Sequence, residues 1–289
     1  MSHLFCFGLG YSARAIARQA AAEGWTITGT STTPDGAARI RAMGYHGLVY
    51  DGSAPGEEVG ARLRGATHVV ASAAPDASGD PVLRHHAADL AGATSVKWIG
   101  YLSTVGVYGD RQGGWVEETS DLRPVSQRSR QRVAAETEWL AFAARAGKTV
   151  QVFRLSGIYG PGRSAIDNLR EGSARRLVKP GQVFNRIHVE DIAGAVWAAM
   201  TRGGTHQIYN VTDDEPAPPQ DVVAYAATLL GLPIPPEIPF DTADLSPMAR
   251  SFYGENKRVS NARLKADLGV TFKYPTYREG MAALAKIPA

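Results

Sequence analysis

Short apolar runs alternate with longer, periodically polar segments through the first half of the chain. The runs have the length and the flanking turn residues of buried strands, and they lie at residues 4–7, 25–30, 48–50, 68–72, 97–102 and 150–155. The segments between them predict helices, among them 13–23, which ends at Gly24, and 133–146. Strands that alternate with helices are typical of a parallel sheet covered on both faces. We therefore expect an α/β protein built on a Rossmann-type, doubly wound parallel sheet.

Proline and glycine become frequent in the second half of the chain, which indicates a change of architecture. They are densest between residues 216 and 239, where Pro233, Pro235 and Pro236 exclude regular structure, whereas the apolar run at 207–211 is expected to return to the main sheet. The predicted division is a dinucleotide-binding Rossmann domain of residues 1–162, to which 186–212 return, and a smaller C-terminal substrate lobe. That lobe would consist of residues 163–185 and 213–289.

Charge and cysteine content narrow the classes of protein. The chain has 31 basic and 28 acidic residues, a net charge of +3, without a long block of one sign, so no nucleic-acid partner is expected. Cys6 is the only cysteine, which excludes an internal disulfide and fits the cytoplasm. No apolar run is long enough to cross a bilayer, and His85 and His86 lack companions at metal-ligand spacing. We expect a cytoplasmic protein with a small-molecule substrate and without a metal or membrane partner; a homo-oligomer stays open.

A glycine-rich loop directly follows the first predicted strand and opens the first predicted helix. It reads Gly8-Leu9-Gly10-Tyr11-Ser12-Ala13, the pattern and context of a dinucleotide-binding loop. Gly8 would allow the tight turn, Gly10 the approach of a pyrophosphate, and Ala13 close packing of helix on strand. The phosphates would lie on the free amides at the start of the helix, including those of Tyr11 and Ser12. The alternative is a strand-to-helix turn that binds no ligand.

The end of the second predicted strand bears on the choice between NAD and NADP. An NAD site usually has an acidic residue about 20 positions after the loop. Here the strand ends in Thr30, Ser31 and Thr32, and Arg14 is a nearby cation. Hydroxyls and a cation suit a ribose 2′-phosphate, which a carboxylate would repel. The sequence therefore favours NADP(H), with NAD(H) as the alternative.

Further candidate cofactor residues follow the third and fourth predicted strands. Asp51 ends the third strand, and Ser72, Ala73 and Ala74 come at the end of the fourth. The carboxyl ends of parallel strands form the edge where ligands of open α/β sheets bind. Asp51 precedes a glycine, so an ordinary Asp-Gly turn explains it equally well.

Several segments, taken in order, resemble the extended short-chain dehydrogenase/reductase family, also called the NAD-dependent epimerase/dehydratase family. They are Ser-Thr-Val-Gly-Val-Tyr-Gly at 103–109, Arg154 with Ile-Tyr-Gly-Pro-Gly at 158–162, Ile-His-Val-Glu-Asp-Ile-Ala at 187–193, and Tyr-Asn-Val at 209–211. The resemblance implies a nicotinamide held against the substrate at the sheet edge near Thr104 and Ser156.

The same resemblance implies catalytic residues, and this chain departs from the pattern there. Thr104 stands where the family has the Ser or Thr that polarises the substrate. The family then uses a Tyr-x-x-x-Lys pair, followed four residues later by Glu. Counted back from Glu136, those positions hold Arg128 and Arg132. A guanidinium stays protonated and cannot accept a proton from an alcohol, although Arg132 could hold the ribose and Arg128 an anion. The alternative places both arginines on a solvated helix face.

The sequence therefore predicts an atypical member of this family. We expect an NAD(P)-dependent oxidoreductase or epimerase/dehydratase acting on a small polar or nucleotide-linked substrate, with Tyr108 or an ordered water in place of the missing phenol. A second hypothesis is a non-catalytic protein that binds NADP(H) and senses the redox state. A third is a purely structural protein with a degenerate loop.

Overall fold

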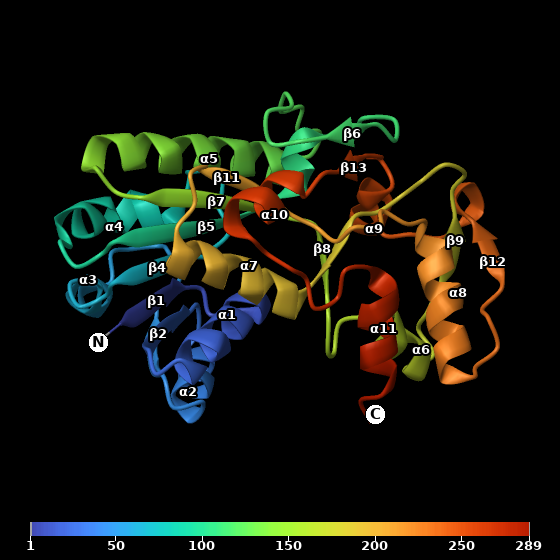
Figure 1. The fold of residues 1–289 in the computed structure, drawn as a ribbon, viewed down its shortest axis with the longest axis horizontal. Coiled ribbons are helices and arrows are strands. Elements are labelled where there is room, and N and C mark those ends of the chain that lie inside the picture. Colours follow the sequence, from blue (N-terminus) through green and yellow to red (C-terminus); the bar gives the residue numbers. More distant parts are fainter. Residues whose placement is uncertain (1, 289) are drawn as a thin grey trace.

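A single parallel sheet forms the centre of the molecule. The computed structural model describes residues 2–288, and within this range seven strands join in the order β11-β7-β5-β4-β1-β2-β3 (Figure 1). They are β1 (His3–Phe7), β2 (Thr26–Ser31), β3 (His46–Val49), β4 (His68–Ala71), β5 (Trp98–Thr104), β7 (Val150–Leu155) and β11 (Ile208–Val211). Every neighbouring pair is parallel. The predicted doubly wound Rossmann-type sheet is confirmed, and its strand order reverses between β1 and β4, where ligands of such sheets bind.

Helices cover both faces of this sheet. One face is covered by α1 (Tyr11–Ala22), α2 (Pro34–Ala42) and α7 (Val189–Arg202), the other by α3 (Glu57–Leu63), α4 (Pro81–Gly92) and α5 (Gln127–Ala146) (Figure 1). In β1, Leu4 and Cys6 pack on the first face and Phe5 and Phe7 on the second. Because both faces are covered, the strand is apolar at every buried position rather than at alternate ones.

Two boundaries differ from the sequence prediction because of local hydrogen bonds. α5 begins at Gln127, before the predicted start at Val133, because the Ser126 hydroxyl accepts a hydrogen bond from the Ser129 amide and caps the helix. β5 continues to Thr104 and leads into the 3-10 helix η1 (Val105–Tyr108). Both extensions bring their residues to the carboxyl edge of the sheet.

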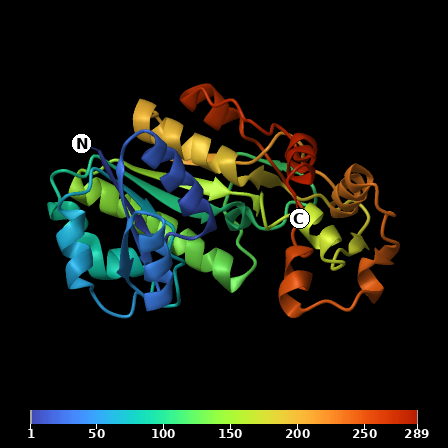
Figure 2. The same cartoon turned by 90° about the horizontal axis from the view of Figure 1, so that it is seen from below.

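A smaller unit lies beside the sheet in both views (Figures 1 and 2). Its core is formed by α6 (Ala165–Arg170), α8 (Pro219–Leu230) and α11 (Tyr277–Ala285). Around them lie β9 (Arg176–Val178) paired with β12 (Glu237–Pro239), then η2 (Phe240–Thr242) and α9 (Pro247–Phe252). Two further pairs link the parts of the chain: β8 (Gly157–Tyr159) with β10 (Arg186–His188), and β6 (Trp115–Val116) with β13 (Arg258–Val259).

One part of the predicted lobe packs elsewhere. In α10 (Ala262–Leu268) and the turn after it, Leu264, Leu268, Val270 and Phe272 are buried in the core that α1 and α7 share with the sheet. The segment 213–289 is therefore divided between the lobe and the main core. Among the described residues, no helix has the length and apolar character needed to span a bilayer.

Candidate active site and cofactor loop

The glycine-rich loop is held against the neighbouring strand ends by backbone contacts. Gly8 has a φ of +79°, and a Cβ there would lie 3.3 Å from the amide nitrogen of Ala73. Its N–H donates to the Thr30 hydroxyl at 2.8 Å, and the Leu9 N–H donates to the Thr30 carbonyl, also at 2.8 Å. Only glycine combines this φ with such a close approach. The turn is therefore built by β1, β2 and the end of β4 together.

Gly10 leaves the start of α1 open. It is the N-terminal cap of the helix but offers no side chain to the free amides, and a Cβ at Gly10 would meet nothing within 4 Å. The first helical hydrogen bond is from Arg14 N–H to the Gly10 carbonyl, so the amides of Tyr11, Ser12 and Ala13 lie before it. Ala13 is fully buried against the sheet. Uncapped amides with free space before them fit the pyrophosphate of a dinucleotide.

The residues predicted to select NADP occupy different environments. Thr30 is 1% exposed and its hydroxyl binds Gly8, so it supports the loop and does not face a ligand, contrary to the prediction. Ser31 is half-buried beside Gly36, where a Cβ would lie 1.9 Å from the serine hydroxyl. Thr32 and Arg14 are exposed and free of such packing.

A carboxylate that was not among the predicted residues lies near the same strand end. Asp35 lies in the first turn of α2, which follows β2 directly, and its side chain is exposed. Thr33 caps this helix by accepting the Gly36 N–H. An acidic residue in the first helical turn is explained by the helix dipole, so its presence does not by itself indicate a ribose contact.

Asp51 adopts the turn that was the alternative reading. Its Oδ1 accepts the N–H of Ser53 at 2.9 Å and the hydroxyl of Ser53 at 2.7 Å. These two hydrogen bonds, from the Ser53 amide and hydroxyl, hold the pKa of the Asp51 carboxyl below its usual range. By contrast, the N–H of Ser72 donates to the Phe7 carbonyl and so extends the pairing of β4 with β1. Ala73 lies against the turn at Gly8. The segment Ser72–Ala74 therefore borders the loop.

Thr104 lies at the end of β5 with its side chain partly exposed. Its hydroxyl accepts the Gly106 N–H at 3.1 Å and so caps η1. A Cβ on Gly106 would lie 2.9 Å from the Ser129 hydroxyl and 3.4 Å from that of Thr104, so the two hydroxyls flank the same glycine. Ser129 was not among the predicted site residues. Its one signal in the sequence is its position beside Arg128, on the helix where the family's catalytic pair is expected.

Tyr108 is not available as the missing phenol. It is 0% exposed, and its hydroxyl accepts from Arg154 Nη1 at 2.8 Å and donates to Asn210 Oδ1 at 2.7 Å. Burial raises the pKa of Tyr108, and the charge of Arg154 opposes that shift. The proposal of Tyr108 as an acid–base group is therefore wrong, because its hydroxyl is enclosed by permanent partners.

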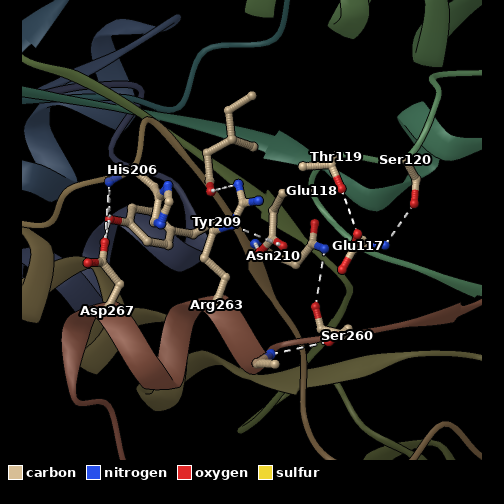
Figure 3. Close-up of polar contacts among 12 residues, drawn as sticks. Glu117, Glu118, Thr119, Ser120, His206, Tyr209, Asn210, Ser260, Arg263 and Asp267 are labelled. Carbon is tan, nitrogen blue, oxygen red and sulfur yellow. Dashed lines mark hydrogen bonds and ion pairs between the residues drawn. The ribbon is translucent and has the colours of Figure 1, made fainter.

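The network around Tyr108 continues to the surface beside α10. The Asn210 N–H donates to Glu118 Oε1 at 2.8 Å, and Glu118 lies 3.6 Å from Arg263 Nε. The Asn210 side chain also donates to the Ser260 carbonyl (Figure 3). These contacts connect η1 and β11 to the C-terminal segment, so the Tyr-Asn-Val segment at 209–211 has a structural use here.

The two arginines at the positions predicted for the family's catalytic pair differ in position. Arg132 donates through Nη1 to the Leu102 carbonyl at 2.8 Å and to the Tyr101 hydroxyl at 3.0 Å, and its guanidinium lies over the Tyr101 ring. It is thus directed at the end of β5. Arg128 is exposed, and within residues 2–288 it makes no hydrogen bond or ion pair. The solvated-face alternative therefore holds for Arg128 and fails for Arg132.

Ser156 supplies an unpartnered polar atom at the end of β7. The residue is 5% exposed, and its Oγ has no hydrogen-bond partner in the described chain, while its N–H donates to Val211. A buried hydroxyl without a hydrogen-bond partner is unfavourable unless a ligand supplies the missing hydrogen bond. Together with the open helix start, this orphaned hydroxyl fits a dinucleotide laid along the sheet edge.

Tyr11 connects the loop to the second unit. Its hydroxyl donates to the Pro161 carbonyl at 3.0 Å, and the guanidinium of Arg163 lies 5.8 Å from its ring centre. The residue that opens α1 therefore also holds the turn after β8. A ligand on α1 would lie next to a contact between the two units.

His188 is part of the junction between the units and not of an acid–base pair. It is buried between Tyr159 and Tyr274, and its Nδ1 accepts the Glu190 N–H at 3.2 Å, which caps α7. Burial lowers the pKa of His188 to about 4, so the ring is neutral at physiological pH. Asp191 accepts the amides of Lys273 and Tyr274 and fastens the C-terminal segment.

Comparison with known proteins agrees with this geometry. The model of the NAD dependent epimerase/dehydratase family matches residues 8–212. Protein YeeZ of Escherichia coli K12 is 29% identical over 95% of this chain and 97% of its own length. The 3-diazoavenalumate denitrifying reductase of a Streptomyces species is 30% identical over 52% of this chain and 51% of its own.

A solved structure is more similar still. A conserved protein of unknown function from Silicibacter pomeroyi is 52% identical, with a TM-score of 0.90 over 98% of both chains. The family match covers the glycine-rich loop, the segments that hold Thr104, Arg128 and Arg132, and β11, and the family is described as NAD dependent. The chain therefore belongs to the NAD-dependent epimerase/dehydratase family.

Proposed function

We propose that this protein is an NADP(H)-dependent reductase of a small polar substrate, with the reaction at the sheet edge between Thr104 and Ser156. The observation that carries the proposal is the chemistry of the groups around Thr104. Tyr101 contacts Arg132, Glu136 contacts Ser103, and Tyr108 ends η1; all three are buried and hydrogen-bonded within the protein. The side chains of Thr104 and Arg132 are half-buried, and that of Arg128 is exposed.

This set of groups can support hydride transfer to a carbonyl. Bound NADPH would supply a hydride to the substrate carbon. The Thr104 hydroxyl can donate a hydrogen bond to the substrate oxygen, and the positive charge of Arg132 would stabilise the negative charge that develops there. A guanidinium cannot act as the base of the reverse reaction. The proton that completes the product alcohol would therefore come from water, and water would take it back in the reverse direction.

The similarity to the Streptomyces reductase supports the same direction. That protein is named as a reductase, and about half of each chain is matched. The match gives no information about the substrate of this chain. The substrate class stays defined by the site, as a polar electrophile small enough to reach Thr104.

The preference for NADP(H) rests on the end of β2. Ser31 stands at the position of the usual acidic residue, and Arg14 and Thr32 are exposed nearby. A 2′-phosphate could take charge-assisted hydrogen bonds from these groups. The negative charge of Asp35 would act against a 2′-phosphate. The relative affinities for NADP(H) and NAD(H) must therefore be measured.

A binding titration tests the cofactor part of the proposal. Gly10→Asp places a carboxylate before the open amides without steric conflict, because nothing lies within 4 Å of a Cβ at Gly10. We expect tight NADPH binding to the wild type and its loss in Gly10→Asp. Gly92→Asp is the matched control, since a Cβ there also meets nothing and Gly92 lies at the far end of α4. Equal NADPH binding by the wild type and Gly10→Asp would refute the site.

Turnover separates the reductase from the non-catalytic alternative. The exposed Arg128 favours a redox-sensing protein, because the catalytic position holds a residue without a partner. NADPH oxidation with a panel of small aldehydes, ketones and diazonium compounds should show turnover that Thr104→Val reduces by about a hundredfold. Tight NADPH binding with no turnover for any compound would instead support the sensor.

A further inference from the structure

Arg186 lies at the carboxyl edge of the sheet, next to Ser156. Its strand β10 pairs with β8 so that Arg186 stands opposite Gly157, the residue after Ser156. The Arg186 carbonyl accepts the Asp213 N–H at 2.7 Å and the Thr212 hydroxyl at 3.2 Å. Its backbone is thus joined to the segments that leave β7 and β11. The residue therefore lies beside the sheet edge at which the reaction is proposed.

The guanidinium of Arg186 is partly buried and oriented by backbone carbonyls. Nη1 donates to the carbonyls of Phe184 and Ala217, at 3.0 Å each. No carboxylate among residues 2–288 forms an ion pair with it. These neutral acceptors fix the orientation of the group and leave its charge uncompensated.

Asp213 is the acid whose charge acts most strongly on Arg186, but among residues 2–288 the two side chains form no ion pair. Asp213 is 1% exposed, its Oδ1 accepts the Glu215 N–H at 3.3 Å, and its Oδ2 has no partner in the described chain. Burial raises the pKa of Asp213 against the charge of Arg186, and burial lowers the pKa of Arg186 against the charge of Asp213. The cost of burying the two charges therefore exceeds the attraction between them.

Phenol groups complete the surroundings of Arg186. Burial raises the pKa values of Tyr159, Tyr253 and Tyr277, and in each case the charge of Arg186 acts against that increase. Tyr253 comes from the end of α9 in the second unit, where it packs on Phe184. Arg186 thus lies between the sheet edge and the lobe, with neutral hydrogen-bonding groups around it.

A partly buried cation without a counter-ion is costly unless a ligand supplies the opposite charge. The planar fork of arginine matches the oxygens of phosphate and carboxylate. We propose that Arg186 binds an oxyanion of the substrate, a phosphate or a carboxylate, and so selects anionic substrates for this sheet edge. The substrate would lie with its anion at Arg186 and its reacting carbon near Thr104 and Ser156. This inference rests on the proposed function, because it concerns the same site.

The test uses inorganic phosphate and malonate as probes of the two oxyanion sources. Each is titrated calorimetrically into the full-length protein at constant ionic strength set with KCl. The comparison is made in the Gly10→Asp background, because the start of α1 is itself a phosphate site. Arg186→Gln should weaken binding of the preferred probe by roughly tenfold or more, the loss expected for a charge-assisted hydrogen bond. Arg186→Lys keeps the positive charge but loses the planar guanidinium. Its affinity for the probe should therefore lie between those of the wild-type residue and Arg186→Gln.

Arg170→Gln is the matched control. Arg170 is also partly buried and donates to one backbone carbonyl, that of Ala285, so its loss should leave probe binding unchanged. If Arg186→Gln does not fold, the comparison of Arg186→Lys with the wild type decides. The proposal would be overturned if the Arg186 variants bound the probe as tightly as the protein that keeps Arg186. It would also be overturned if neither phosphate nor malonate showed saturable binding.

Measuring the affinity for NADPH distinguishes a failure of the Arg186 proposal from a failure of the proposed function. In the protein with Gly10 intact, Arg186→Gln should leave the Kd for NADPH unchanged, because Arg186 is assigned to the substrate. Absence of NADPH binding in the wild type would refute the reductase, while the probe titrations would still decide on Arg186.

Discussion

The guanidinium of Arg154 and the carboxylate of Glu136 form an ion pair between β7 and α5, with Nη2 2.7 Å from Oε2 and each side chain 3% exposed. Ser103 donates to the same carboxylate at 2.5 Å. Arg154 in turn donates to Tyr108. Segments that carry the family resemblance are therefore joined in one buried network, which explains why they occur together although none of these four side chains is exposed at the reaction edge.

Removing the acid of this pair should destabilise the protein strongly. Glu136→Gln leaves Arg154 buried without its counter-charge, and we expect a loss of about 3–5 kcal/mol in the free energy of unfolding. Urea unfolding followed by circular dichroism measures it. Glu138→Gln, two residues along α5 with an exposed side chain, should change stability by no more than about 0.5 kcal/mol. A Glu136→Gln protein as stable as the control would contradict the assigned role.

Tyr108 should matter for stability and not for proton transfer. Tyr108→Phe removes the hydroxyl that joins Arg154 to Asn210, and unfolding should become easier by about 1–3 kcal/mol. The pH profile of turnover should keep its shape, because a hydroxyl sealed by these partners exchanges no proton with substrate. Loss of one limb of the profile in a folded Tyr108→Phe protein would restore Tyr108 as the acid.

Cofactor preference should respond to a charge at the end of β2. Ser31→Asp places a carboxylate at the position where NAD-binding proteins hold the ribose hydroxyls, and it would repel a 2′-phosphate. We expect the ratio of Kd for NADP⁺ to Kd for NAD⁺ to rise by at least about tenfold. Ser31→Asn has nearly the same size beside Gly36 without the charge, so it reports any steric effect. An unchanged ratio would show that Ser31 lies away from the adenosine ribose.

Acid should weaken the junction at His188. Its pKa is lowered by burial from 6.5 to about 4, so the unfolded chain binds the proton before the folded protein does. This contribution to stability is complete above pH 6.5 and is lost as the pH falls toward 4. The Tm of His188→Asn, which keeps a capping side chain at α7, should fall less than that of the wild type between pH 7 and 4.5.

Other buried groups titrate in the same interval. His68, whose pKa burial also lowers to about 4, acts in the same direction as His188, whereas burial raises the pKa values of Asp191 and Asp213 to about 6 and about 8, which acts in the opposite direction. All three are present in the wild type and in His188→Asn, so the difference between the two Tm curves isolates His188. Parallel curves would mean that His188 becomes protonated without penalty.

The local features of this protein could be predicted from its sequence. The apolar runs lie where the strands of the main sheet form, and the loop from Gly8 to Ala13 joins β1 to α1. Such features depend on neighbouring residues: a fully covered strand needs an apolar side chain at every position, and a tight turn needs glycine. The presence of Arg128 in place of a tyrosine could also be predicted, because the position is found by counting back from Glu136 along a single helix.

The environment of each candidate side chain was decided only by the tertiary structure. Thr30 and Tyr108 are polar and stand in the right motifs, yet partners distant in sequence, Gly8 and Asn210, bind their hydroxyls. Arg186 lacks a motif, and it reaches the sheet edge because β10 pairs with β8. Spacing along the chain determines which residues share a helix face or a strand end. Burial, counter-charge and access to a ligand depend on contacts between distant segments, and these form only when the chain is folded.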